Sequence, residues 1–200
     1  MNWTFDARHS MRDPETGIAG RAAMARSSRL RKSDWLDAGL AALAKDGPDA
    51  LKAEPLARAL DTTKGSFYWH FADVPAFHAA LIAHWAGGAN SALFDAAEEA
   101  DTHTAALRGM AQQIAAPAPR DPFARAEPSM RAWAASHKGA AKAIASVDAE
   151  RMQVIAALLD RIGVSNREIA QLILAAANGL PKKVTGDPMG TLVDLVLALR

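Results

Sequence analysis

The segment Lys64-Gly65-Ser66-Phe67-Tyr68-Trp69-His70-Phe71 decides the fold, because it is a short, aromatic-rich helix that directly follows another one. Phe67 and Phe71 lie four residues apart, so both are expected to point inward from the same helical face. The preceding helix contains Leu56-Ala57-Arg58-Ala59-Leu60, and the turn Asp61-Thr62-Thr63 separates the two. Two short helices joined by a tight turn predict a helix-turn-helix, whose second helix enters the major groove of DNA.

The aromatic block and its correctly spaced flanking helices resemble the headpiece of the TetR (tetracycline-repressor-like) family. The similarity is strong over residues 33–85 and continues more weakly through Met130-Arg131-Ala132-Trp133-Ala134 and Val147-Asp148-Ala149-Glu150-Arg151. The resemblance implies a homodimer, a double-stranded DNA operator of two half-sites, and a pocket for a small-molecule inducer or co-regulator. It therefore implies a ligand-responsive transcriptional regulator, most simply a repressor.

The chain departs from the family pattern at positions that bear on DNA binding. Asp61 stands where the turn usually has Gly, although Asp tolerates a left-handed backbone better than most residues. Val74 replaces a common phosphate-binding Lys, and Lys52 replaces the usual Thr cap. Motif and resemblance together predict a set of residues that contact DNA: Lys52, Thr63, Lys64, Gly65, Ser66, Tyr68, Trp69, His70, Arg29 and Arg31. The alternative is an aromatic cluster that packs the headpiece, beside an ordinary solvated lysine at position 64.

Charge is distributed unevenly along the chain. Residues 1–32 carry seven Lys/Arg against three Asp/Glu, whereas residues 33–85 carry four against seven. Basic N-terminal arms commonly bind nucleic acid. We expect four cations of this arm to bind phosphates or to enter the minor groove: Arg26, Arg29, Arg31 and Lys32. The alternative is a solvated tail without a role in binding.

Hydrophobic periodicity predicts an all-α fold of about nine helices. The expected domains are a flexible basic arm (1–32), a three-helix DNA-binding headpiece (33–80) and a helical ligand-sensing and dimerisation domain (81–200). Ser33 and Asp73 are expected N-caps, Gly47 a helix end, and Gly87-Gly88 a kink or break. Ser165-Asn166-Arg167-Glu168 is expected to form a capping box. The uncharged stretch 74–94 is interpreted as a buried helix of a protein that does not enter a membrane, because Pro, Gly, His and Asn interrupt it.

Two sets of apolar residues are candidate sites in the second domain. The first set is expected to line a ligand pocket: Trp85, Met110, Phe123, Met130, Trp133 and Met152. Each of these residues could equally be simple core. The second set belongs to two helices whose apolar faces are broader than one core requires, which predicts a helix-on-helix dimer interface: Ile169, Leu172, Ile173, Leu192, Val196 and Leu199.

Other classes of function find little support in the sequence. The chain has no cysteine, which excludes disulfides and thiolate zinc sites and fits a cytoplasmic, nucleoid-associated protein. No nucleophile elbow, zinc-protease motif, phosphate-binding loop or dinucleotide fingerprint is present, so neither an enzyme nor a cofactor is expected. His78 and His84 lie on different helix faces and make a poor metal pair. A helical interaction module that has lost DNA binding remains the alternative.

Overall fold

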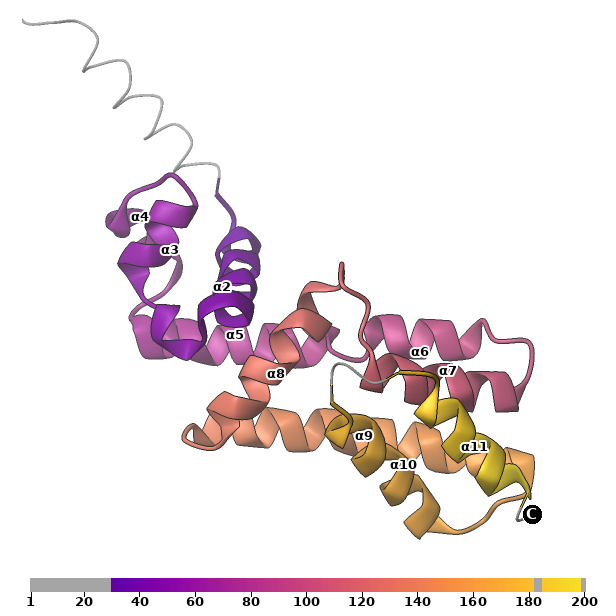
Figure 1. Cartoon of the computed structure of the whole chain (residues 1–200). Coiled ribbons are helices and arrows are strands. Elements are labelled where there is room, and N and C mark those ends of the chain that lie inside the picture. The colour runs from indigo at the N-terminus through magenta and orange to yellow at the C-terminus, as the bar shows by residue number, and fades with distance from the viewer. Residues whose placement is uncertain (1–29, 182–184, 199–200) are drawn as a thin grey trace, which may run out of the picture.

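The computed structural model describes residues 30–181 and 185–198, and within them every regular element is helical (Figure 1). The predicted all-α fold is therefore confirmed. The elements are α2 (Lys32–Asp46), the 3-10 turn η1 (Pro48–Ala50), α3 (Ala53–Ala59), α4 (Lys64–His70), α5 (Val74–Gly88), α6 (Ser91–Glu98), α7 (His103–Ala115), α8 (Pro122–Ala134), α9 (Lys138–Ile162), α10 (Arg167–Gly179) and α11 (Pro188–Ala198).

Helix ends follow local side-chain chemistry, with two shifts from the predicted caps. Helix α2 begins at Lys32, so Ser33 lies in its first turn, and the backbone amide of Arg31 donates to Asp34 (2.7 Å). Before α10 the capping residue is Asn166, whose side chain accepts from the amide of Glu168 (2.9 Å). In both places the expected cap, Ser33 or Ser165, is replaced by a neighbour one or two residues away. Gly47 (φ 78°) ends α2 as predicted.

The expected break at Gly87-Gly88 is present and turns one predicted helix into two. Helix α5 starts at the cap Asp73, which accepts from the amide of Ala76 (2.7 Å), and it ends at Gly88. A Cβ atom at Gly88 would overlap the ring of Phe123, whereas one at Gly87 would meet open space. Gly88 thus allows α8 to approach closely. Within residues 30–181 and 185–198 no helix combines the length and the apolar character needed to span a bilayer.

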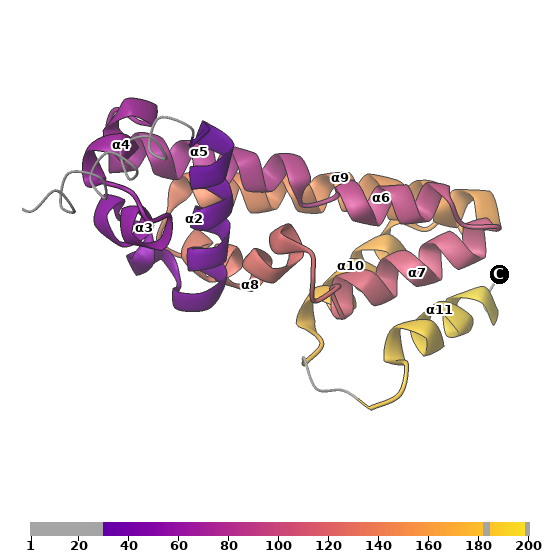
Figure 2. The ribbon, with the colours of Figure 1, turned by 90° about the horizontal axis from the view of Figure 1, so that it is seen from above.

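Two hydrophobic cores run along the elongated molecule. The first joins α2, α3, α4 and α5 to α8 and the first half of α9, with Trp35, Phe67, Trp85 and Met130 among its fully buried side chains. The second joins α6, α7, α10 and α11 to the second half of α9. Figures 1 and 2 show the headpiece at one end, α8 crossing beside α2, and α10 and α11 near the other end. The first core therefore extends well beyond the headpiece.

A buried polar network lies at the seam between the two cores. The guanidinium of Arg151, which is 3% exposed, donates to both oxygens of Glu127 (2.8 and 2.9 Å) and to Oδ1 of Asn90 (2.7 Å). Arg131 donates to the same Glu127 and to Asp148 (2.6 Å). Burial alone would raise the pKa of Glu127, but hydrogen bonds and charge from Arg151 and then Arg131 outweigh it and lower that pKa. Through Asn90 the network connects the break between α5 and α6 to α8 and α9.

Candidate nucleic-acid interface

The turn between α3 and α4 takes the shape that a helix-turn-helix requires. Asp61 adopts a positive φ of 49°, the left-handed conformation that glycine usually supplies. Thr63 caps α4, and its hydroxyl accepts from the amide of Ser66 (3.3 Å). The departure at Asp61 therefore leaves the turn intact.

Aromatic rings fix the orientation of α4 against the headpiece. Phe67 is fully buried and its ring lies 5.1–5.4 Å from those of Trp35, Phe71 and Phe77. Edge-on and tilted ring pairs of this kind constrain rotation as well as burying apolar area. The inward positions predicted for Phe67 and Phe71 are present.

The outer face of α4 presents most of the expected DNA-binding side chains. Trp69 is 89% exposed and Tyr68 is 47% exposed, while Lys64 and Gly65 are also on the surface. His70 is half-buried beside Trp35 (6.3 Å between ring centroids). Ser66 is only 3% exposed, so its side chain faces the core and not the surface expected from its position in the motif. Large apolar rings at the surface of a short helix indicate a contact surface.

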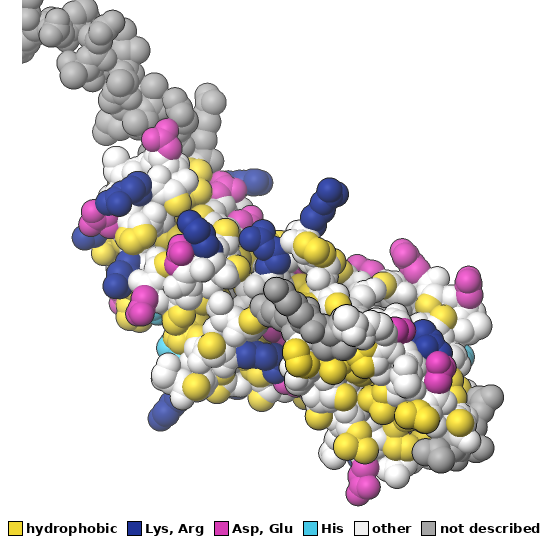
Figure 3. Space-filling model, in the orientation of Figure 1, with side chains coloured by type: hydrophobic (Ala, Val, Ile, Leu, Met, Phe, Trp, Pro, Cys, Tyr) yellow, Lys and Arg dark blue, Asp and Glu magenta, His cyan; other side chains and the backbone are white. Residues whose placement is uncertain are grey.

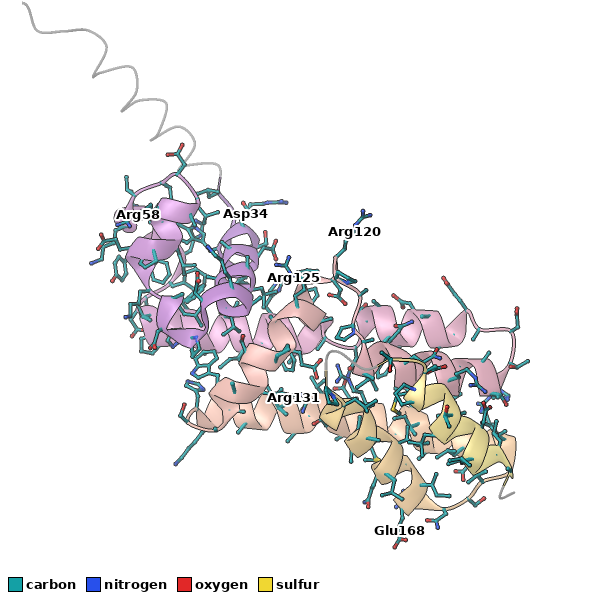
Figure 4. All side chains as sticks on the ribbon, viewed as in Figure 1. Asp34, Arg58, Arg120, Arg125, Arg131 and Glu168 are labelled. Carbon is teal, nitrogen blue, oxygen red and sulfur yellow. The ribbon has the colours of Figure 1, made fainter. Side chains whose placement is uncertain are left out.

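A groove of about 400 Å³ lies between α3, α4 and the start of α5. Its charged and hydrogen-bonding lining residues are Lys52, Glu54, Arg58, Lys64 and Tyr68. Three of the four Lys/Arg side chains of residues 33–85 line this groove, but only one of the seven Asp/Glu does. The acidic headpiece therefore has a locally cationic face. Figure 4 shows Arg58 on the outer side of the headpiece, facing away from the body.

Sequence reasoning missed Glu54 and Arg58 as residues of this face. Their spacing could have predicted it, because residues four apart lie on the same side of a helix. Lys52, an expected DNA-binding residue, is the N-cap of that helix. Val74, where the family commonly has Lys, is half-buried and lies against the first core. The groove thus keeps Lys52 and Lys64 and adds Arg58.

The basic arm is described only from residue 30 onward. Arg31 caps α2 with its side chain 82% exposed, and the ammonium of Lys32 lies 5.3 Å from the centre of the Phe71 ring. The partly buried Leu30 packs on the first core. Residues 30–32 are therefore held against the headpiece. Arg26 and Arg29 lie outside the described residues.

The expected ligand-pocket residues do not surround a common cavity. Trp85, Phe123, Met130 and Trp133 pack in or against the first core, whereas Met110 and Met152 belong to the second. Trp85 also donates its indole N–H to the backbone carbonyl of Phe123 (3.0 Å). These side chains fill space in the structure.

A cavity of about 80 Å³ does lie at the seam, beside the buried pair Glu127 and Arg151. Its other walls come mainly from α6, α7 and the loop before α8, including Leu93, Ile114 and Asp121. Pockets that enclose small organic ligands usually measure about 300–1,000 Å³. The cavity is smaller than that range and shares no residue with the expected set.

The expected dimer residues divide into exposed and buried ones. Leu172 is 64% exposed, and Ile169 and Leu192 are half-buried. Ile173 and Val196 are buried in the second core of their own chain, and Leu199 lies outside the described residues. Leu195, not anticipated from the sequence, is 60% exposed. Figure 3 shows hydrophobic side chains gathered over α10 and α11.

Comparison with known proteins identifies the headpiece. Residues 36–73 match the family model described as bacterial regulatory proteins, tetR family. This stretch of the chain is similar to the TetR-family headpiece. The matched residues cover most of α2, all of α3 and α4, and the cap of α5. They include every residue that lines the groove except Val74.

Solved structures share the fold beyond the matched residues. A putative TetR-family transcriptional regulator from Rhodococcus sp. is 18% identical, with a TM-score of 0.68 over 83% of this chain and 98% of that one. A putative transcriptional regulator from Streptomyces coelicolor A3(2) is 13% identical, with a TM-score of 0.62 over 84% and 96%. No curated protein matches the sequence. At these identities the likeness shows the fold.

Proposed function

We propose that this chain is a transcriptional regulator that binds double-stranded operator DNA through the groove between α3 and α4. The observation that carries the proposal is the clustering of Lys52, Arg58 and Lys64 on one face of a headpiece with more acids than bases. Phosphate neutralisation by Lys and Arg supplies most of the non-specific affinity for DNA. Tyr68 lines the same groove as these cations, and Trp69 follows it on α4 with its ring exposed, so both rings are available for contact with sugars and bases.

A two-fold homodimer is part of the proposal. Leu172 of α10 and Leu195 of α11 expose large apolar side chains, and Ile169 and Leu192 lie half-buried on the same two helices. Apolar surface of this kind on a helix pair supports burial against a second copy of the same surface. Two headpieces in one dimer would contact two half-sites about 34–36 Å apart.

Response to a small ligand is proposed at the seam between the two cores. The cavity beside Glu127 and Arg151 touches the α5–α6 break and the start of α8, and α8 also packs on the headpiece helix α2. A ligand that widened this cavity would move α8 relative to α6 and α7, and so would shift the headpiece. Repression relieved by such a ligand is the simplest form of this regulation.

The test of DNA binding is selection of duplexes from a random library by the purified full chain, followed by gel shift at low and physiological salt. We expect enrichment of a two-half-site sequence that is bound more tightly than random DNA. Lys64→Ala and Tyr68→Ala should reduce the difference in affinity between the selected sequence and random DNA. Lys142→Ala, an exposed charge on α9, is the matched control and should leave binding unchanged. Absence of any enrichment would favour a helical interaction module instead.

A further inference from the structure

The groove that we assign to DNA contains one acid, Glu54. It lies in the first turn of α3 and shares the groove with Lys52, Lys64 and Tyr68. A carboxylate that faces DNA repels the phosphates, so an acid among these cations lowers the affinity for DNA of any sequence. A hydrogen bond from a base to this carboxylate would favour only those sequences that present a donor there.

The carboxylate of Glu54 has one oxygen held and one oxygen available. Arg58, one turn further along α3, donates from its guanidinium to Oε1 of Glu54 (3.3 Å). Among the described residues no side chain donates to Oε2 of Glu54. Both side chains are largely exposed, so the pair contributes little to folding. In the structure it directs Oε1 of Glu54 toward Arg58.

Base chemistry restricts what such a carboxylate can accept from. In the major groove guanine presents two acceptors, and thymine presents an acceptor and a methyl group. Adenine offers an amino group next to the N7 acceptor, which would repel a carboxylate. Cytosine presents its N4 amino group as a donor without a neighbouring acceptor on the same base. A carboxylate at this edge therefore favours cytosine.

We propose that Glu54 determines operator specificity by accepting a hydrogen bond from the N4 amino group of a cytosine in each half-site, with Arg58 as its positioning residue. The proposal rests on the proposed DNA-binding function. Lys52, Lys64 and Arg58 supply the phosphate attraction that offsets the charge of Glu54 on any DNA. The cytosine contact then raises the affinity for the operator above the affinity for random DNA.

The test compares Glu54→Ala and Glu54→Gln with the wild type, on a fluorescent duplex selected by the wild-type protein and on its single-base variants. For the wild type, one cytosine position should resist replacement, with a loss of affinity of about five- to 150-fold. Glu54→Ala should lose that preference and bind random duplex more tightly than the wild type does. Glu54→Gln should shift the preference at that position toward adenine, because a carboxamide matches its N6 and N7 atoms.

A chemically modified base and a control variant sharpen the result. N4-methylcytosine at the preferred position keeps its pairing with guanine but blocks the donor in the major groove. It should weaken the wild type as much as a base change does and should leave Glu54→Ala unaffected. Glu99→Gln removes an exposed acid at the end of α6, far from the headpiece, and should behave as the wild type.

The outcomes separate this inference from the function on which it rests. If the wild type selects an operator and Glu54→Ala keeps the same preference at every position, the role of Glu54 is overturned and DNA binding stands. A preference that depends on Glu54 but falls on another base overturns the cytosine assignment. If the wild type binds no duplex, the proposed function fails and this inference fails with it.

Discussion

The two cores of the molecule are built from different side chains. The first is rich in aromatic rings, with Trp35, Phe67, Phe71 and Phe77 packed edge-on or tilted around α4. The buried members of the second include no aromatic residue, and all but Val164 come from α6, α7, α9, α10 and α11. Ring pairs have preferred geometries, whereas aliphatic side chains pack without directional preference. The comparison indicates that the first core holds α4, the helix proposed to face DNA, at a fixed angle. The second core only has to bury apolar area and present an outer face.

The largest expected effect comes from breaking the seam between the cores. Arg151→Ala would leave the buried Glu127 and Asn90 without their main partner. Removal of one member of a buried ion pair typically costs about 3–5 kcal/mol. Chemical denaturation should show this loss in the free energy of unfolding, with Lys142→Ala on the same helix as a control close to the wild type. A cost below about 1 kcal/mol would mean that the network does not join the two cores.

The two neighbouring glycines at the end of α5 provide a matched pair with opposite expectations. Gly88→Ala should lower the free energy of unfolding by about 1–3 kcal/mol, because the added methyl group overlaps the ring of Phe123. Gly87→Ala meets open space and should be neutral or stabilising by up to about 1 kcal/mol. Thermal unfolding of both variants checks the difference. Equal effects would show that α5 and α8 are not in close contact at Gly88.

The pH dependence of stability tests the charge state of the seam. The pKa of Glu127 is lowered in the folded chain, so its contribution is fully present above the ordinary carboxyl value of about 4.3. That contribution is lost as the pH falls from this value through the lower folded pKa. Glu127→Gln should therefore be destabilised at neutral pH, and its deficit relative to the wild type should shrink in acid. A deficit that stays constant from pH 7 to pH 3 would contradict the assigned shift.

The smallest effect on folding is expected at the outer face of the second core. Leu172→Glu changes an exposed side chain and should alter the stability of the isolated chain by less than about 0.5 kcal/mol. It should nevertheless convert the proposed dimer to monomer in sedimentation velocity. Ile173→Glu, one residue along, places a charge in the second core and should unfold it. An unchanged dimer in Leu172→Glu would remove α10 from the interface.

The sequence predicted local structure better than it predicted surfaces. The cap at Asp73 and the helix end at Gly47 depend on neighbouring residues, and the turn at Asp61 follows from backbone chemistry at that position alone. The periodic pattern could not separate Leu172 from Ile173, because both lie at the edge of an apolar face and only the packing of α10 on α9 and α11 exposes one of them.

Sites that depend on contacts between distant elements were harder to predict. The expected pocket residues are large and apolar, as core residues also are, and the structure uses them to fill space. Arg151 and Glu127 lie 24 residues apart in sequence, on two consecutive helices, and no local motif marks that pair. The cationic groove was likewise hidden by the net acidity of the headpiece, because a sum of charges does not show where they lie.

The most direct test of the account is hydrogen–deuterium exchange of the full chain with and without a duplex selected by the wild type. The account places DNA on the face formed by α3, α4 and the start of α5, so peptides covering residues 52–74 should become protected. Peptides from α6 and α7 should exchange at unchanged rates. Protection that falls on α10 and α11 alone, or is absent from residues 52–74, would contradict the assignment of the groove as the DNA interface.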